Sequence, residues 1–173
     1  MTNAVRARTG VVDLVLAVVL VALLSWLVLF AVRGDAAAPG STPAEERAQE
    51  YADITRAART ETLAFLTIDH TKMDELTARV LDGATGTFKK QYQTSLKSLK
   101  DSATSQESFS TGAVDEIGLS EVDDDSASVF VAAASKVKNK GTKGKVEDRS
   151  WRIKLTMAKE GSRWLVSQLE FVG

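Results

Sequence analysis

An uninterrupted apolar run near the N-terminus constrains this chain of 173 residues more than any other feature. Between Gly10 and Val32, 20 of 23 residues are apolar, and the 19 residues from Leu14 to Val32 carry no charge. An α-helix of that length reaches about 28 Å, close to the thickness of the hydrocarbon core of a bilayer. A helix also satisfies its own backbone N–H and C=O groups, as a lipid environment requires. Residues 10–32 are therefore predicted to form a transmembrane helix.

A cleaved signal peptide is the competing interpretation of this run. Arg6 and Arg8 resemble the charged start of a signal peptide, and the three alanines at 36–38 resemble a small-residue cleavage site. However, the apolar part of a signal peptide usually has about 7–15 residues, fewer than this run. Arg33 and Asp35 also interrupt the path to the alanines. We therefore favour a retained membrane anchor.

The distribution of basic residues predicts the orientation of that anchor. Arg6 and Arg8 precede the run, whereas Arg33 alone follows it closely. Because positive charge tends to stay on the cytoplasmic side, residues 1–9 are predicted to be a cytoplasmic tail. Residues 33–42 then form a flexible linker, and residues 43–173 form an extracytoplasmic domain. The Arg33-Gly34-Asp35 triplet in the linker resembles an adhesion tripeptide, but three residues recur too easily by chance to assign that role.

Composition excludes several classes of site. The chain has no cysteine and one histidine, which excludes disulfides, thiol catalysis, cysteine-based zinc sites and multi-histidine metal sites. The formal net charge of −1 gives no reason to expect nucleic-acid binding. No phosphate-binding loop, nucleophile elbow or zinc motif is present. We therefore predict no catalytic residue, no cofactor and no metal ligand.

The first half of the domain is predicted to be helical. Thr42, Pro43 and Glu45 form a helix start with a capping residue, proline at the first helical position and a glutamate three residues after the cap. Apolar residues at helical spacing continue this helix to about residue 66. A short helix over 73–81 follows a connection over 68–71. A third helix begins at Thr85 or Thr87 and runs to about residue 103.

After Ser105 the apolar period changes from near 3.6 to 2, which predicts strands. The clearest candidates cover 127–134, 151–157 and 164–172, and a weaker one covers 109–119. In the last candidate the apolar residues up to Val166 lie on one face of the strand, and those from Leu169 onward lie on the other. Such a change of face predicts a β-bulge. Turn residues separate the four candidates. The predicted fold is therefore α+β: about three helices packed on a curved, four-stranded antiparallel sheet.

Three features could carry chemistry, but each has a simpler structural explanation. His70 is the one histidine, the residue type most often used for acid–base chemistry, and it follows Asp69, yet adjacency in sequence does not bring the two side chains together. The aspartates at 123–125 lack the spacing of a calcium loop and are expected to form a solvated turn. A lysine cluster in one hairpin could touch anionic lipid or a partner, but such residues also discourage edge pairing. It comprises Lys136, Lys138, Lys140, Lys143 and Lys145.

Several short motifs resemble those of a known family. They are Ala48-x-x-Tyr51, Leu66-Thr67-Ile68-Asp69, Ala84-Thr85-Gly86-Thr87-Phe88 with Tyr92 four residues later, and Trp164-Leu165-Val166. Together with the single apolar helix, they resemble the actinobacterial mammalian-cell-entry (Mce) associated membrane proteins. The resemblance implies a cone-shaped domain like that of nuclear transport factor 2. It also implies an accessory subunit that stabilises an envelope complex importing lipids or sterols, and it carries over no catalytic residue.

The expected function is therefore that of a non-enzymatic, single-pass membrane protein. Its expected partners are the lipid bilayer and Mce transporter subunits or related envelope proteins. Two alternatives stay open at this point. One is a scaffold or assembly factor of a type IV secretion-like system, and the other is a small enzyme resembling ketosteroid isomerase, which would need acid–base residues facing a pocket.

Overall fold

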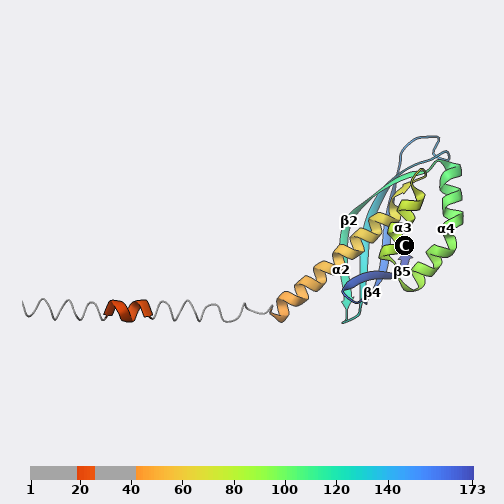
Figure 1. The fold of residues 1–173 in the computed structure, drawn as a ribbon. Helices are drawn as coiled ribbons and strands as arrows, with labels where there is room; N and C mark the ends of the chain where they lie inside the picture. Colours follow the sequence, from red (N-terminus) through yellow and green to blue (C-terminus); the bar gives the residue numbers. More distant parts are fainter. Residues whose placement is uncertain (1–18, 26–41) are drawn as a thin grey trace, which may run out of the picture. The chain divides into compact units, whose positions relative to one another are not determined.

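The computed structural model describes residues 19–25 and 42–173 (Figure 1). Residues 19–25 are helical, and the remainder of the predicted transmembrane span 10–32 lies outside the described residues. The predicted tail 1–9 and nearly all of the linker 33–42, including Arg33-Gly34-Asp35, also lie outside them. Within the described ranges, no helix is both long and apolar enough to cross a membrane. The chain divides into two compact units, Met1–Glu45 and Glu46–Gly173.

Three helices occupy the first half of the domain, as predicted: α2 (Pro43–Leu66), α3 (Met73–Gly83) and α4 (Gly86–Gln106). The start of α2 is the capping box expected from the sequence. The backbone N–H of Thr42 donates to Oε2 of Glu45 at 2.7 Å, and the N–H of Glu45 donates to Oγ1 of Thr42 at 3.2 Å. These two bonds satisfy backbone donors that a helix N-terminus otherwise leaves without partners.

The sheet has five antiparallel strands rather than the predicted four. They are β1 (Ile68–Asp69), β2 (Phe109–Val122), β3 (Ser126–Lys138), β4 (Glu147–Glu160) and β5 (Arg163–Phe171), in the order β1-β2-β3-β4-β5. The additional strand is β1, which the sequence predicted as a connection and which pairs with Phe109 and Ser110. Two residues are too few to show an apolar period, so only tertiary pairing defines this strand. The sheet remains open, with β1 and β5 at its edges.

A bulge in β5 confirms the predicted change of face. Val166 pairs with Met157 of β4 and Gln168 pairs with Thr156, so Ser167 is an extra residue on β5. The Ser167 hydroxyl donates to the backbone oxygen of Thr156 at 3.0 Å. This insertion allows Val166 to be buried in the core while Leu169 packs partly against it.

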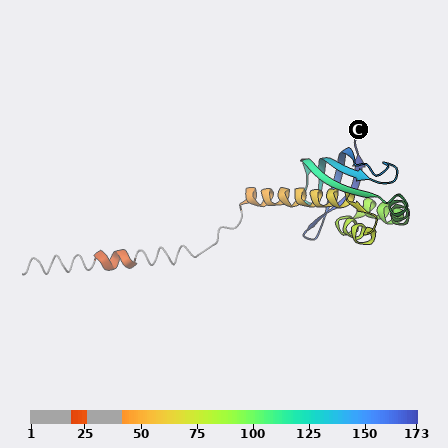
Figure 2. The same ribbon diagram turned by 90° about the horizontal axis from the view of Figure 1, so that it is seen from above.

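The core lies between α2 and the inner face of the sheet, with the helices gathered on one side (Figure 2). Ile54 and Ala58 of α2 are fully buried against Val129, Ile153 and other inward residues of β3, β4 and β5. The outward residues of β3 are not covered within the described part of the chain. Phe130, on the outward face, is 43% exposed. β3 is thus interior in the sheet but has only one buried face.

Candidate functional site

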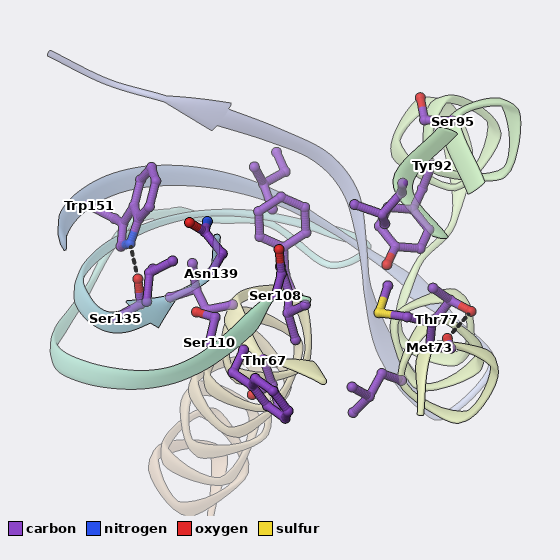
Figure 3. A pocket seen from close by; sticks show the side chains of 18 of the residues that line it. Thr67, Met73, Thr77, Tyr92, Ser95, Ser108, Ser110, Ser135, Asn139 and Trp151 are labelled. Atoms are coloured by element: carbon purple, nitrogen blue, oxygen red, sulfur yellow. Dashed lines mark hydrogen bonds between the residues drawn. The ribbon is translucent and has the colours of Figure 1, made fainter. Parts of the chain in front are cut away.

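A hollow of about 620 Å³ opens between the inner side of the sheet and helices α3 and α4 (Figure 3). The end of α2 and the chain after it contribute its floor through Phe65 and Thr67. α3 contributes Met73 and Thr77, and α4 contributes residues from Phe88 to Leu99. We refer to this hollow as the aromatic chamber. Its size falls within the range of about 300–1,000 Å³ that is typical of small-molecule sites.

Five aromatic side chains from four different elements give the chamber its character. Phe65 of α2 contacts Phe88, Tyr92 and Phe171, with ring centroids 6.0, 6.4 and 6.1 Å away. Trp151 of β4 lies 5.3 Å from Phe171, also measured between ring centroids. The rings meet at tilted angles, which aromatic pairs prefer to a stacked sandwich. The chamber is therefore apolar on several sides at once.

The polar groups in the chamber fall into two sets. Some are already hydrogen-bonded within the protein. Trp151 Nε1 donates to Ser135 Oγ at 2.9 Å, and the Thr77 hydroxyl donates to the backbone oxygen of Met73 at 2.7 Å (Figure 3). The other set consists of lining hydroxyls that make no hydrogen bond within the described residues: those of Tyr92, Ser95, Ser108 and Ser110.

No lining residue of the aromatic chamber is an aspartate, glutamate, lysine, arginine or histidine. Tyr92 is its one titratable lining residue, and burial, reinforced by the charge of Glu61, raises the pKa of its phenol to about 12. The phenol is therefore protonated at neutral pH and supplies neither a charge nor a general base. The lining of the chamber is therefore uncharged at neutral pH.

A buried carboxyl lies outside the chamber, in a smaller hollow of about 340 Å³ between α2, α3 and the start of β5. Glu61 of α2 is 3% exposed, and its Oε1 has no hydrogen-bond partner within the described residues. Burial raises the pKa of Glu61 to about 8, and the nearby Asp82 carboxylate contributes to the rise. Gly83 makes room for this side chain, since a Cβ there would lie 1.9 Å from Glu61 Oε2.

Neither the chamber nor the burial of Glu61 is predicted by the sequence. Phe88 and Tyr92 belong to one of the family motifs, but apolar periodicity does not show which helix faces leave space between them. Glu61 lies in a charged, amphipathic helix where most carboxylates face solvent. Gly83 leaves space for the Glu61 side chain, but the two residues lie on different helices. Their contact is therefore visible only in the tertiary structure.

His70 and Asp69 each make local contacts in the described structure. The His70 ring packs edge-on against Phe109 with centroids 4.9 Å apart. The Asp69 carboxylate accepts hydrogen bonds from the Thr71 N–H at 2.9 Å and the Thr71 hydroxyl at 2.6 Å, and these bonds lower the pKa of Asp69. Asp69 thus closes a local turn before α3.

The aspartates at 123–125 are exposed and form the turn between β2 and β3. Asp123 N–H donates to the backbone oxygen of Ser126 at 2.8 Å, and the Asp125 oxygen accepts from Lys159 N–H at 2.9 Å. Across the part of the chain that the structure describes, no group of three or more potential ligands could hold a metal ion.

The lysine-rich hairpin between β3 and β4 is partly neutralised. Lys136 pairs with Asp148 at 3.0 Å, and Lys140 pairs with Glu107 at 2.9 Å. Lys140 Nζ also donates to the backbone oxygen of Ser105 at 3.0 Å, which ties the hairpin to the end of α4. These contacts agree with a structural role for two of the five lysines.

The fold resembles several solved structures of type IV secretion proteins. An IcmL-like type IV secretion system protein from Legionella pneumophila subsp. pneumophila str. Philadelphia 1 has a TM-score of 0.57 at 12% identity, over 70% of this chain and 91% of that one. The periplasmic domain of DotI has a TM-score of 0.56 at 8% identity, over 79% and 99%. CagV, a VirB8 homolog of Helicobacter pylori strain 26695, has a TM-score of 0.56 at 6% identity, over 70% and 97%. At such low identity the similarity is one of fold.

Sequence comparison gives a closer relationship. The chain is 32% identical over 129 residues to the uncharacterized protein Rv1363c of Mycobacterium tuberculosis (strain ATCC 25618 / H37Rv). That match covers 75% of this chain and 49% of the relative, so the chain spans about half the length of the relative. A family model described as "Uncharacterized protein Rv1363c/MT1408-like" matches residues 6–173. Because this match covers nearly the whole sequence, the chain belongs to the Rv1363c/MT1408-like family.

Proposed function

We propose that this protein is a non-enzymatic, membrane-anchored accessory subunit of an Mce-type lipid or sterol import complex in the cell envelope. In this proposal residues 10–32 hold the α+β domain on the extracytoplasmic side of the membrane. Confinement to the bilayer raises the effective concentration of the domain near membrane-bound partners. The domain then stabilises the complex through its surface.

One observation carries the proposal: a 19-residue uncharged run precedes a domain with the fold of periplasmic secretion-protein domains. That order of parts suits a protein that works beside the membrane on its outer side. The motifs around Tyr51, Phe88 and Trp164 add the resemblance to Mce-associated proteins. The uncharged lining of the aromatic chamber supports the non-enzymatic part of the proposal.

A scaffold of a type IV secretion-like assembly is the second candidate. It is favoured by the three fold matches, each of which covers more than nine-tenths of the solved domain. A ketosteroid-isomerase-like enzyme, the other alternative, would need an acid–base residue facing the chamber. Tyr92, with its raised pKa, is the one titratable group among the lining residues.

Affinity purification from native envelopes tests the proposal. The full chain carries a C-terminal tag and is crosslinked mildly before solubilisation, and the co-purifying proteins are identified by mass spectrometry. A tagged, unrelated single-span protein expressed at the same level serves as the control. Enrichment of Mce transporter subunits over the control is the expected result. Enrichment of secretion-system subunits instead, or of no envelope complex, would overturn it.

A further inference from the structure

The aromatic chamber has the properties of a ligand site, which is a role beyond that of an accessory subunit. We propose that it binds a small, neutral and largely apolar molecule that carries one hydroxyl or carbonyl group, as a long-chain alcohol does. The inference does not depend on which envelope complex the protein joins. It rests on the lining of the chamber, on the polar groups left free inside it and on its access to solvent.

The lining of the chamber favours a ligand that is mostly apolar and carries no charge. Phe65, Phe88 and Trp151 offer ring faces and edges from three different elements, so a ligand would exchange water for apolar contacts on several sides. No charged side chain lines the chamber. An ionised ligand group placed there would lose its hydration without gaining an ion pair, which is strongly unfavourable.

Four hydroxyls that line the chamber make no hydrogen bond within the described residues and could bind a polar group of that ligand: those of Tyr92, Ser95, Ser108 and Ser110. Ser110 is 7% exposed, and its hydroxyl makes no hydrogen bond within the described residues. Tyr92 reaches from α4 into the chamber, on the side that faces Met73 and Thr77 (Figure 3). Its phenol stays protonated because its pKa is about 12, so it can donate to a hydroxyl or carbonyl oxygen. A few placed polar groups in an apolar pocket are typical of small-molecule sites.

The chamber is also accessible from outside. Gln91 and Ser95 of α4 line it and are exposed, and Phe171 at the end of β5 is 54% exposed. These residues form part of its rim, whereas Ser110 and Ser135 are buried deeper in it. A ligand can therefore enter without unfolding the core around Ile54 and Val129.

Photoaffinity labelling of the full chain in lipid nanodiscs tests this inference. The probe is a long-chain aliphatic alcohol with a diazirine in its chain, and the matching carboxylic acid is the charged comparison. Labelled peptides are mapped by mass spectrometry. We expect the alcohol to label peptides that contain Phe65, Phe88 or Trp151, and the acid to label them much less at pH 7. Some of the probe dissolves in the surrounding bilayer, and its labelling of residues 10–32 serves as an internal reference.

A matched pair of variants on α4 separates the chamber from the general surface. Gln91 and Gln93 are both exposed glutamines of the same helix, but only Gln91 lines the chamber. We expect Gln91→Trp to narrow the rim and remove most of the chamber labelling, and Gln93→Trp to leave it unchanged. Tyr92→Phe, which removes one hydrogen bond, should weaken binding of the alcohol by about two- to tenfold.

Three results would overturn the inference. The first is labelling confined to residues 10–32, and the second is equal chamber labelling in the two tryptophan variants. The third is acid labelling as strong as that by the alcohol, which would point instead to a charged group near the lysine hairpin. Because these readouts involve no partner protein, they remain informative even if no transporter subunit co-purifies.

Discussion

At the scale of single residues, the burial of Glu61 is expected to make the stability of the domain depend on pH. Its carboxyl is buried in the folded protein, where its pKa is about 8, whereas an ordinary glutamate has a pKa of 4.5. Between these two values the folded state keeps a proton that the unfolded state releases. The free energy of unfolding therefore falls as pH rises through this window, by up to about 1.4 kcal/mol per pH unit.

A glutamine at position 61 should remove this pH dependence. Since glutamine cannot ionise, Glu61→Gln is expected to match the wild type near pH 5 and to exceed its stability by several kcal/mol at pH 8. Urea denaturation of the full chain in a non-ionic detergent, followed by circular dichroism, measures the difference. Glu116→Gln, at an exposed carboxylate of β2, is the control. Equal pH profiles for Glu61→Gln and the wild type would contradict the assignment.

At the scale of elements, the start of α4 lies close to the β5 bulge. Gly86 begins α4 with a φ of +52°, which favours glycine. The N–H of the preceding Thr85 donates to the Val166 backbone oxygen at 2.8 Å. A Cβ at position 86 would lie 3.2 Å from the Cβ of Ser167, the extra residue of the bulge. A side chain at residue 86 would therefore be strained at this φ and would require Ser167 to move by a few tenths of an ångström.

Gly86→Ala should therefore destabilise the domain by about 1–2 kcal/mol, since alanine is strained at this φ and crowds Ser167. Gly118→Ala is the matched control, because its Cβ would meet nothing within 4 Å and its φ is not positive. Thermal denaturation of both variants measures the effect. A loss of stability in Gly118→Ala as large as that in Gly86→Ala would show that the contact with the bulge is unimportant.

At the scale of the whole molecule, the predicted topology can be tested directly because the chain has no cysteine. A single cysteine introduced by Asp124→Cys lies in the exposed turn between β2 and β3, and one introduced by Thr2→Cys lies in the predicted cytoplasmic tail. A membrane-impermeant maleimide should label the first variant in intact cells and the second only after lysis. The reverse pattern, or equal labelling in intact cells, would contradict an extracytoplasmic domain.

The sequence determined the features that depend on neighbouring residues. The capping box of Thr42 and Glu45, the limits of α2 and the turn at 123–125 each follow from local hydrogen bonding and backbone preference. The bulge at Ser167 could also be predicted, because a change of face along one strand is itself a local pattern.

Only the tertiary structure decided the features that depend on distant residues meeting. β1 exists because Ile68 and Asp69 reach β2, and the aromatic chamber exists because rings from four different elements leave space between them. The buried state of Glu61 likewise requires Gly83 to approach it from another helix. The spacing of apolar residues along the sequence shows which face of a helix or strand is buried. The volume left between two such faces depends on how the elements pack in the folded protein.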